Sequence, residues 1–434
     1  MGVLFYTEDE VMKLTGYSKS DLEKFYKDES MKLEEYKALG LKLDMSRGKP
    51  SPEQLDLSNE MLTHCLDGDH ISETGIDCRN YGVLDGIYEA KRLFMPMMGV
   101  GRYEIIIGGN SSLQLMYDTL ARAMLLGVKG SPEPWCHRKT VKWLCPAPGY
   151  DRHFAICEAF GMEMITVPML EDGPDMDMVE KLVSEDEDIK GIWCVPRYAN
   201  PTGVVYSDEV VRRFASLNPA APDFRIYWDD AYCVHDLTDE HAEILNILEE
   251  CKKTGKPDMP LIFASTSKIS FPGGGIAAVG GSEENMEFMR KQMSFQIIGY
   301  DKLNQLRHAK FFKDYDGIME HMKKHRAILK PKFDLVVSTL EKELAPLGIG
   351  TWSNPKGGYF VSFDGMEGTA KRIVALCKDA GVTMTGAGAS FPYGKDSKDT
   401  NIRIAPSYPS LDELGKAMEI FVVAVKVASA EQLL

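Results

Sequence analysis

Five apolar runs of this sequence each end in residues whose types could do chemistry on a bound molecule. In chain order they are Gly109 and Asn110 after YEIII, Tyr150 and His153 after VKWLCP, Asn200 after GIWCVP, Asp229 and Tyr232 after RIYW, and Lys268 after LIFASTS. Small residues at a helix start bind anions through their N–H groups, and an aromatic ring stacks on a flat ligand. A carboxylate, an amide and an amine add charge, hydrogen bonding and a nucleophile.

Each group also has an ordinary structural interpretation when it is taken alone. Asn110 could cap a helix, and the NPTG string that begins at Asn200 could be a plain turn. A tyrosine exposed in a turn would equally explain PGYDRH. One of the two adjacent carboxylates, Asp229 and Asp230, could cap the next helix, and Lys268 could extend to solvent from a strand end. The combination is therefore more informative than any single member.

Taken together, the five strand ends meet the needs of one cofactor, pyridoxal 5'-phosphate. Its phosphate needs an anion site, its ring an aromatic face, its pyridine nitrogen an acidic partner, its phenolic oxygen hydrogen-bond donors, and its aldehyde a lysine. A lysine with the ordinary pKa of about 10.4 is protonated at neutral pH. Burial and nearby positive charge must therefore lower the pKa of Lys268 before its amine can attack a carbonyl.

The elements that must position these residues are short strands that alternate with helical patterns between residues 85 and 290. Strands are predicted at 103–109, 141–146, 164–169, 191–196, 225–230, 261–266 and 276–281. These runs are continuously apolar, so we expect helices to bury both faces of a mainly parallel α/β sheet. Ligands bind beyond the carboxyl ends of such strands, which is where the residues named above lie.

The segments on either side of this sheet follow other patterns. Residues 7–40 are charged and periodic and predict two amphipathic helices that end at Gly40. Helical patterns dominate residues 284–345, and short strands are predicted in GGYFVSFD, VTMTGAG and NIRIAPS. We therefore predict three regions: a helical arm with part of a small domain at 1–60, a large α/β domain at 61–320, and a small α+β domain at 321–434.

Composition excludes several classes of function. The net charge of −15 disfavours nucleic acid and anionic membranes as partners. The nine cysteines show neither a disulfide nor a metal-ligand spacing, so we expect a reducing compartment and no structural metal. The N-terminus lacks the pattern of a signal peptide and no run of about 18 apolar residues occurs. A cytoplasmic location is therefore expected.

The ordered motifs resemble those of the fold type I pyridoxal-phosphate aminotransferases, and within them the aspartate aminotransferases with a long N-terminal extension. The resemblance covers nearly the whole chain and rests on Tyr81-x4-Gly86, GGN, PGYDRH, NPTG, DDAY, SxSK, a following PG, NIRIAPS and an RGKP element. It implies a large domain with a mainly parallel central sheet, a smaller α+β domain, and a homodimer with shared active sites.

The same resemblance implies roles for individual residues. Lys268 matches the Schiff-base lysine, which also acts as the base that moves the substrate proton. Asp229 matches the aspartate that faces the pyridine nitrogen, and Tyr150 matches the aromatic residue on the ring. Asn200 and Tyr232 match the pair that hydrogen-bonds the phenolic oxygen. The implied phosphate contacts are Gly109, Asn110, Ser265 and, from the neighbouring subunit, Tyr81.

Substrate contacts are implied in the same way. Arg403 matches the arginine that holds the substrate α-carboxylate with a bidentate fork, which a lysine lacks. Gly48 in RGKP falls at the family's glycine near the substrate, although this element could also merely shape a turn. His153 matches the histidine that supports the aspartate. The usual arginine for a second carboxylate is not evident in MSFQIIGYDKLNQ, so we predict that Arg152 binds that group.

One position departs from the family pattern. Most members carry an arginine that pairs with the cofactor phosphate, and here Gly275 stands in its place within PGGGI. Backbone N–H groups or an arginine from elsewhere could replace it, and both options remain open. The string from Gly273 to Ala278 also fits the GxGxxA pattern of a dinucleotide fold. However, a strand-like run follows it instead of a helix, which argues against a nicotinamide enzyme.

These observations favour transamination between aspartate and 2-oxoglutarate by a ping-pong mechanism. Transamination of another amino acid, or β-elimination by a β-lyase, would use the same cofactor and is the first alternative. A cofactor-sensing regulator with an aminotransferase-like domain is the second. It would need a DNA-binding module, and the N-terminal arm of about 45 residues is acidic and too short for a winged helix.

Overall fold

The computed structural model describes residues 13–66 and 68–434, and its largest element is an eight-stranded sheet of order β2-β9-β8-β7-β6-β3-β4-β5. The strands are β2 (Ile105–Ile107), β3 (Lys142–Ala147), β4 (Glu163–Leu170), β5 (Gly173–Pro174), β6 (Ile189–Cys194), β7 (Arg225–Asp229), β8 (Pro260–Ser265) and β9 (Ala277–Gly280). The five strands from β8 to β4 pair in parallel, whereas β9 is antiparallel to both of its neighbours and β5 to β4. The predicted mainly parallel sheet is confirmed.

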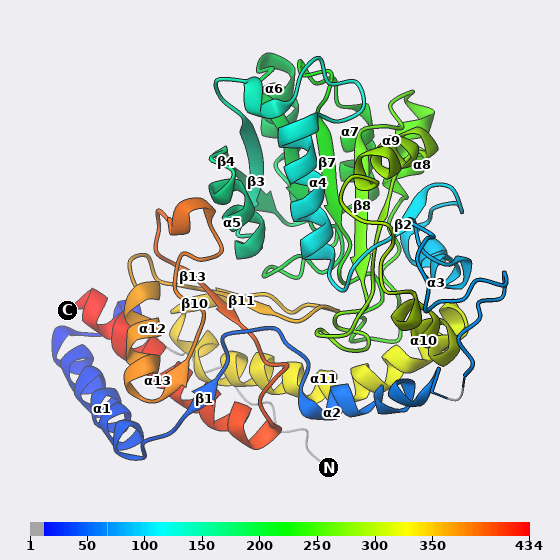
Figure 1. Cartoon of the computed structure of the whole chain (residues 1–434). Helices are drawn as coiled ribbons and strands as arrows, with labels where there is room; N and C mark the ends of the chain where they lie inside the picture. Colours follow the sequence, from blue (N-terminus) through cyan, green and yellow to red (C-terminus); the bar gives the residue numbers. More distant parts are fainter. Residues whose placement is uncertain (1–12, 67) are drawn as a thin grey trace, which may run out of the picture.

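Helices cover both faces of this sheet, as the continuous apolar runs predict (Figure 1). Successive residues of one strand enter different clusters of the core: Ile226 and Trp228 of β7 pack on one side, and Tyr227 packs on the other. One face is covered by α4 (Ser112–Leu126), α5 (Asp151–Ala159) and α9 (Glu283–Met293). The other is covered by α3 (Tyr88–Met98), α6 (Met176–Glu185), α7 (Asp208–Ser216), α8 (Ile247–Lys253) and α10 (Lys302–Phe312).

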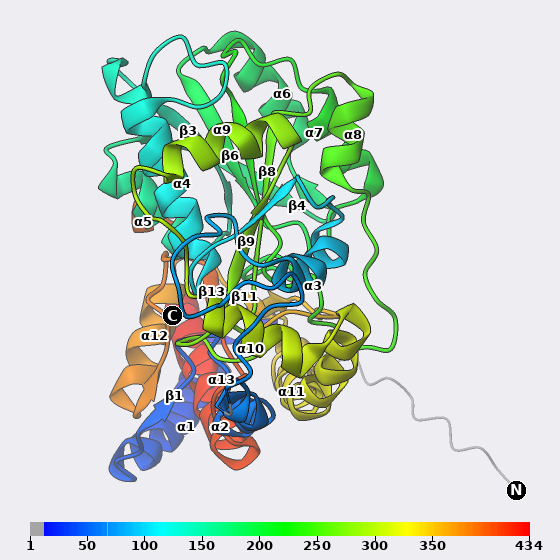
Figure 2. The same ribbon diagram turned by 45° about the vertical axis from the view of Figure 1, so that its right-hand side comes forward.

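The smaller α+β part contains two short sheets and lies below the large sheet in Figure 1. Its strands are β10 (Gly350–Trp352), β11 (Val361–Gly365) and β13 (Asn401–Ile404), which pair antiparallel, and β1 (Leu43–Asp44) with β12 (Val382–Thr383), which pair in parallel. Its helices are α1 (Lys19–Ala38), α2 (Pro52–Asp56), α11 (Tyr315–Glu343), α12 (Ala370–Asp379) and α13 (Leu411–Leu433). The helix α1 packs along α13, where Tyr36 Oη donates to Glu419 at 3.0 Å (Figure 2).

The long helix α11 joins the two parts of the molecule. Its first turns place Ile318 and Met322 in the core beneath the large sheet, and later turns place Phe333 and Val336 in the core of the small part. The predicted boundary at residue 320 falls inside this helix. The division into three regions remains a prediction, and α11 contributes apolar side chains to both cores.

The N-terminal arm differs from the prediction of two helices. Residues 13–40 of the arm form one α-helix, α1, preceded by a 3-10 turn at Leu14–Gly16; residues 7–12 lie outside the described part. Gly16 and the extended Tyr17 end the turn, and Ser18 caps α1 by accepting a hydrogen bond from the Asp21 N–H. Within the described ranges, no helix has the length and apolar character needed to cross a membrane.

Candidate functional site

A cavity of about 600 Å³ lies at the carboxyl ends of the central strands, with walls from both parts of the molecule. Nine of the residues predicted for the site line it: Gly48, Tyr150, Arg152, Asn200, Asp229, Tyr232, Ser265, Lys268 and Arg403. The strand ends β7 and β8 supply the floor, and the small part supplies Phe360, Thr385 and Arg403. Parallel strands thus bring together residues that are far apart in the sequence.

Asp229 is the last residue of β7 and is almost fully buried. Its Oδ2 lies 3.0 Å from His153 Nε2, and the His153 ring stacks on Trp193 with a centroid distance of 4.4 Å. Its Oδ1 is buried and has no hydrogen-bond partner within the described chain. A buried carboxylate oxygen without a partner is costly, so this atom is free to accept a hydrogen bond from a bound molecule.

Lys268 follows β8 in a turn, and its amine lies beside the ring of Tyr232, 5.1 Å from the ring centroid. Burial lowers the pKa of Lys268 below its ordinary value, while the negative charge of Asp229 acts in the opposite direction. The sequence reasoning required burial together with nearby positive charge. Burial alone lowers the pKa of Lys268, because the charged side chain that acts on it, Asp229, is a carboxylate and raises the pKa.

The same cavity that Asp229 and Lys268 line is also lined by Tyr150, Tyr232 and Asn200. Burial raises the pKa of Tyr150 to about 12, and it raises the pKa of Tyr232 well above the ordinary value, so both phenols stay protonated at neutral pH. Asn200 points inward from the NPTG turn, and its Oδ1 accepts a hydrogen bond of 3.3 Å from Arg403. These side chains offer hydrogen-bond donors and aromatic surface to a flat ligand.

Arg403 extends from β13 into the cavity and is 7% exposed. Its Nη1 donates to Asp151 Oδ1 at 2.7 Å, its Nη2 donates to Thr385 Oγ1 at 3.2 Å, and its guanidinium carbon lies 4.9 Å from the centre of the Phe360 ring. Gly48 explains how the RGKP segment fits here. A Cβ at position 48 would lie 2.4 Å from the Phe360 ring, so only glycine lets the backbone lie against that ring.

The helix start after GGNSS also lies at the cavity, where it places the two residues that follow Gly109 and Asn110 on the wall. Ser111 and Ser112 line the cavity, and α4 begins at Ser112. Gly109 and Asn110 are outside the lining: the Gly109 carbonyl accepts from the Ala277 N–H at 2.8 Å, and Asn110 Nδ2 donates to the Pro272 carbonyl at 3.2 Å. Both bonds hold the turn in place, and neither residue caps the helix.

The family model described as "Aspartate amino-transferase" matches residues 17–434, which is nearly the whole chain. The chain belongs to the aspartate aminotransferase family. An aspartate aminotransferase from Corynebacterium glutamicum is 44% identical over 94% of this chain and 94% of its own length. A crystal structure of an aspartate transaminase from the same organism has a TM-score of 0.95, with 43% identity over 98% of this chain and 100% of that one.

A more distant structure shares the fold of this aspartate aminotransferase family member. It is an α-aminoadipate aminotransferase from Thermus thermophilus, complexed with N-(5'-phosphopyridoxyl)-L-leucine, with a TM-score of 0.73 and 19% identity over 90% of this chain and 93% of that one. The fold type I architecture expected from the sequence is therefore confirmed. The dinucleotide alternative is wrong, because the glycine run is followed by β9 and not by a helix.

Gly275, where the sequence resemblance leads us to expect an arginine, is tightly packed. A Cβ at Gly275 would lie 2.9 Å from both the Phe271 carbonyl oxygen and Thr266 Oγ1. Asn304 Nδ2 donates to the carbonyls of Gly274 and Gly275 at 2.9 and 3.0 Å. An arginine at position 275 would require this turn to shift.

The second carboxylate of DDAY, Asp230, does not cap a helix. Its Oδ2 forms a buried ion pair with Arg197 at 2.7 Å, away from the cavity that Asp229 lines. Burial raises the pKa of Asp230, and Arg197 acts in the opposite direction. The pair links the ends of β6 and β7 and offers no group to the site.

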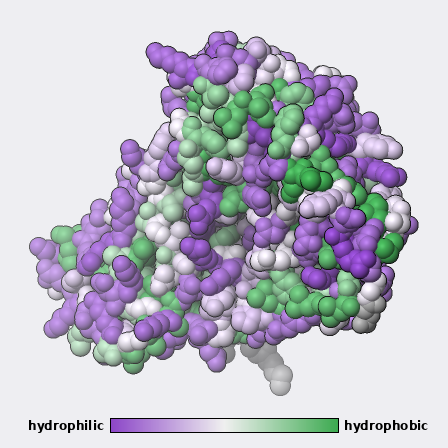
Figure 3. Space-filling view, viewed as in Figure 1, coloured by the Kyte–Doolittle hydropathy of each residue, from purple (hydrophilic) through white to green (hydrophobic). Residues whose placement is uncertain are grey.

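Two predicted residues lie at the edge of the site. Arg152 lines the cavity but is exposed, as is Arg47 of the RGKP segment. Tyr81 is 83% exposed and lies outside the lining. It is one of the large exposed hydrophobic side chains. Figure 3 shows hydrophobic areas within a mainly hydrophilic surface.

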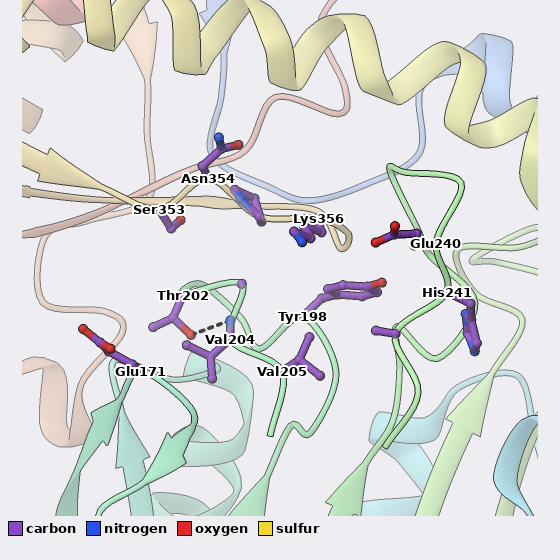
Figure 4. A pocket seen from close by; sticks show the side chains of 13 residues that line it. Glu171, Tyr198, Thr202, Val204, Val205, Glu240, His241, Ser353, Asn354 and Lys356 are labelled. Atoms are coloured by element: carbon purple, nitrogen blue, oxygen red, sulfur yellow. Dashed lines mark hydrogen bonds between the residues drawn. The ribbon is translucent and has the colours of Figure 1, made fainter. Parts of the chain in front are cut away.

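A second cavity, of about 470 Å³, lies on the other side of the loop that carries Asn200. Tyr198, Thr202 and the residues after it form one wall, and Ser353, Asn354 and Lys356 form the facing wall (Figure 4). Gly203 lets the two walls meet, because a Cβ there would lie 2.6 Å from Pro355. The loop after β6 therefore separates two cavities, and the residues predicted for catalysis line only the first.

The backbone that carries Lys268 is held by buried histidines that sequence reasoning missed. His321 and His325 of α11 both contact the Ile269 carbonyl, at 3.0 and 3.1 Å, and His308 of α10 lies 2.8 Å from Ser270 Oγ. HMKKH has the composition of a cationic segment, yet its two histidines are four residues apart and share one helix face. That spacing is the one feature of the sequence that indicates two histidines directed to the same neighbour.

We predict that these histidines make the protein sensitive to acid. Burial lowers the pKa of His308 and His321 to about 4, and that of His325 and of the equally buried His235 to about 3. The unfolded chain takes up these protons near pH 6.5. The unfolded state therefore binds more protons as the pH falls from 6.5 toward 4, and the free energy of unfolding decreases by about 1 kcal/mol per histidine between pH 6.5 and 5.5.

Urea unfolding between pH 7.5 and 5.5 checks this prediction. His325→Asn should show a shallower dependence of the unfolding midpoint on pH than the unsubstituted protein. His137→Asn is the control, because that side chain is 61% exposed, and its pH dependence should be unchanged. Equal slopes for the buried and the exposed variant would contradict the assignment.

Proposed function

We propose that this chain transfers the amino group of aspartate to 2-oxoglutarate by a ping-pong mechanism with pyridoxal 5'-phosphate. The observation that carries the proposal is the convergence of Lys268, Asp229 and Arg403 in one cavity of about 600 Å³. A nucleophilic amine, a buried carboxylate and a guanidinium fork are the groups that the cofactor and an amino acid substrate require. The family to which the chain belongs supports the same conclusion.

The residues present fit the cofactor. The partnerless Oδ1 of Asp229 is suited to accept a hydrogen bond from a protonated pyridine nitrogen. The start of α4 offers N–H groups and the hydroxyls of Ser111 and Ser112 to a phosphate, and Ser265 and Ser267 add two more hydroxyls. Tyr150, Asn200 and Tyr232 remain for the ring and its phenolic oxygen. When bound, pyridoxal 5'-phosphate supplies the electron sink that makes the substrate Cα proton acidic.

Lys268 is the proposed base of the reaction. Its lowered pKa increases the fraction of neutral amine, and the neutral Nζ can accept the proton from the substrate Cα. The same nitrogen could return that proton to a second atom within its reach, after which hydrolysis would release the 2-oxo acid. Tyr359 Oη lies 3.5 Å from the Lys268 carbonyl and donates to it, so the backbone of the base is fixed during the transfer.

Asp229 and Arg403 each bind a group of opposite charge. The Asp229 carboxylate, oriented by His153, stabilises positive charge at the pyridine nitrogen. The Arg403 guanidinium lies over Phe360 and beside Asn200, where it can hold the substrate α-carboxylate. Phe360 shields one face of the guanidinium from water, which strengthens the interaction with a carboxylate.

We predict that Arg152 selects dicarboxylate substrates. It is exposed at the cavity wall next to Tyr150 and can meet the side-chain carboxylate of aspartate. Arg152→Ala should raise KM for aspartate about tenfold, the cost of one solvent-accessible charge-assisted hydrogen bond, and leave KM for alanine unchanged. Arg47→Ala is the matched control, because Arg47 is exposed on the same cavity. A dicarboxylate preference that survives in Arg152→Ala, or is lost in Arg47→Ala, would remove Arg152 from this role.

Steady-state kinetics test the proposed function directly. Varying aspartate at several fixed concentrations of 2-oxoglutarate should give the parallel double-reciprocal lines of a ping-pong mechanism. A screen of other amino donors under the same conditions measures the preference. Faster turnover of another donor, or release of ammonia without an acceptor keto acid, would favour another substrate or β-elimination instead.

We further propose that the enzyme is a homodimer of the reducing cytoplasm. Tyr81, Phe295 and Ile298 are 83%, 83% and 61% exposed. Their segments meet, because a Cβ at Gly299 would lie 2.5 Å from the Gly82 carbonyl oxygen. Such a group of apolar side chains supports burial by a second copy of the chain, with Tyr81 reaching its site. Sedimentation equilibrium should give twice the chain mass, and a monomer would contradict the proposal.

All nine cysteines are free, which fits a reducing compartment.

A further inference from the structure

The guanidinium proposed for the substrate α-carboxylate already binds a carboxylate of its own chain. Arg403 Nη1 donates to Asp151 Oδ1 at 2.7 Å, and the two residues are 252 apart in the sequence. The other hydrogen bonds of Arg403 are longer and go to neutral oxygens of Asn200 and Thr385. Its Nε is buried and has no partner within the described ranges. Asp151 is therefore the strongest ligand that this guanidinium has.

Asp151 is attached to a rigid element but keeps freedom in its side chain. It is the first residue of α5, and the same helix carries His153, which is held by Asp229 and stacked on Trp193. The Asp151 side chain is 32% exposed and lines the cavity, whereas that of Arg403 is 7% exposed. A carboxylate that turns away from Arg403 would remain at the N-terminus of α5, where the helix dipole favours negative charge.

We propose that Asp151 is an internal carboxylate that occupies Arg403 until a substrate carboxylate displaces it, and so sets the affinity of the site for its substrates. The inference rests on the proposed function, because the displacing group is the α-carboxylate of the amino acid. A substrate that uses Nη1 must displace Asp151. A substrate that uses the other edge of the guanidinium meets a cation that is already neutralised and a like charge beside it. In both cases the charge of Asp151 weakens carboxylate binding.

A purely structural role for Asp151 predicts the opposite change in carboxylate affinity when its charge is removed. If the ion pair only orients the guanidinium, neutralising Asp151 loosens Arg403 and weakens carboxylate binding. If Asp151 competes, neutralising it strengthens binding. Asp151→Asn separates the two, because asparagine keeps an Oδ1 acceptor for Arg403 and removes only the charge.

The test is isothermal titration calorimetry of the holoenzyme with maleate, a dicarboxylate that has no amino group to transfer. Asp151→Asn should lower the Kd for maleate about tenfold, which corresponds to about 1.4 kcal/mol. KM for aspartate should fall by a similar factor, so that the effect lies in KM and not in kcat. An unchanged or higher Kd in the variant, or failure of both proteins to bind maleate, would overturn the inference.

Asp208→Asn is the matched control. Asp208 is the first residue of α7 as Asp151 is of α5, it faces Arg212 at 3.6 Å, and it is remote from the cavity lining. Its variant should bind maleate as the unsubstituted protein does. Calorimetry needs no turnover, so tighter maleate binding by Asp151→Asn in a protein that does not transaminate aspartate would support the inference while the proposed function failed. Turnover of aspartate by the unsubstituted protein, together with weaker maleate binding by Asp151→Asn, would overturn the inference while the proposed function held.

Discussion

Replacing Lys268 with alanine is expected to lower kcat for amino transfer by roughly 10⁴-fold or more, since it removes both a general base and a nucleophile. The amine lies at the floor of the cavity beside Tyr232, and burial lowers its pKa toward the range in which it can accept a proton. Among the described residues, the other lysine on this cavity is Lys49, which is partly exposed and lies over the ring of Tyr408 at 3.6 Å. The loss should therefore not be made up by a neighbour.

Borohydride reduction followed by peptide mass spectrometry gives an independent readout. The unsubstituted protein should carry a pyridoxyl adduct on the peptide that contains ASTSK, and Lys268→Ala should carry none. Lys332→Ala is the control: Lys332 is also buried, burial lowers its pKa, and its Nζ donates to the Ser407 carbonyl at 2.9 Å away from the cavity lining. An adduct on any other lysine would disprove the assignment of Lys268.

Asp229→Asn is expected to lower kcat about 10³-fold, or about 4 kcal/mol of transition-state stabilisation. An amide is neutral and cannot hold positive charge at the pyridine nitrogen, so the electron sink of the cofactor is weakened while the shape of the site is kept. His153 retains a hydrogen-bond partner in this variant, because the asparagine side chain can still face its Nε2. The loss should therefore appear in catalysis more than in folding.

Asp230→Asn is the neighbouring control for Asp229→Asn. It breaks the buried pair with Arg197, so it should reduce the free energy of unfolding by about 3–5 kcal/mol. It should leave the absorbance spectrum of the bound cofactor and kcat close to those of the unsubstituted protein at room temperature. A kcat for Asp229→Asn within tenfold of the starting value would exclude a charge role for Asp229.

The sheet could be predicted from the sequence because its signals are local. Residues 225–229 of the run RIYWDD form β7, and successive residues of it, such as Tyr227 and Trp228, pack on opposite faces, as a doubly buried strand requires. Lys268 and Asp229 could be predicted for the same reason, since each lies at or just beyond a strand end. The arm was less predictable, because the charged periodicity of residues 7–40 does not reveal that Gly16 and Ser18 interrupt it.

What the sequence could not reveal are contacts between distant segments. Nothing around Asp151 identifies Arg403 as its partner, and nothing in RGKP shows that Gly48 must clear the Phe360 ring. The histidines under Lys268 follow the same rule, because they come from α10 and α11. Ser111 and Ser112 line the cavity at the start of α4, and the role of Gly109 and Asn110 as phosphate contacts stays a prediction.

The pairing of β1 with β12 has a consequence for how the protein is made. Leu43 of the first strand lies opposite Val382 of the other. On a ribosome that adds about 5–20 residues per second, β1 waits roughly 20–70 s for its partner to emerge. During that interval the apolar face of α1, with Leu22 and Leu33, has no α13 to cover it. The arm therefore stays without its packing partner until the last helix is made, and the strand pair next to Gly48 forms only late in synthesis.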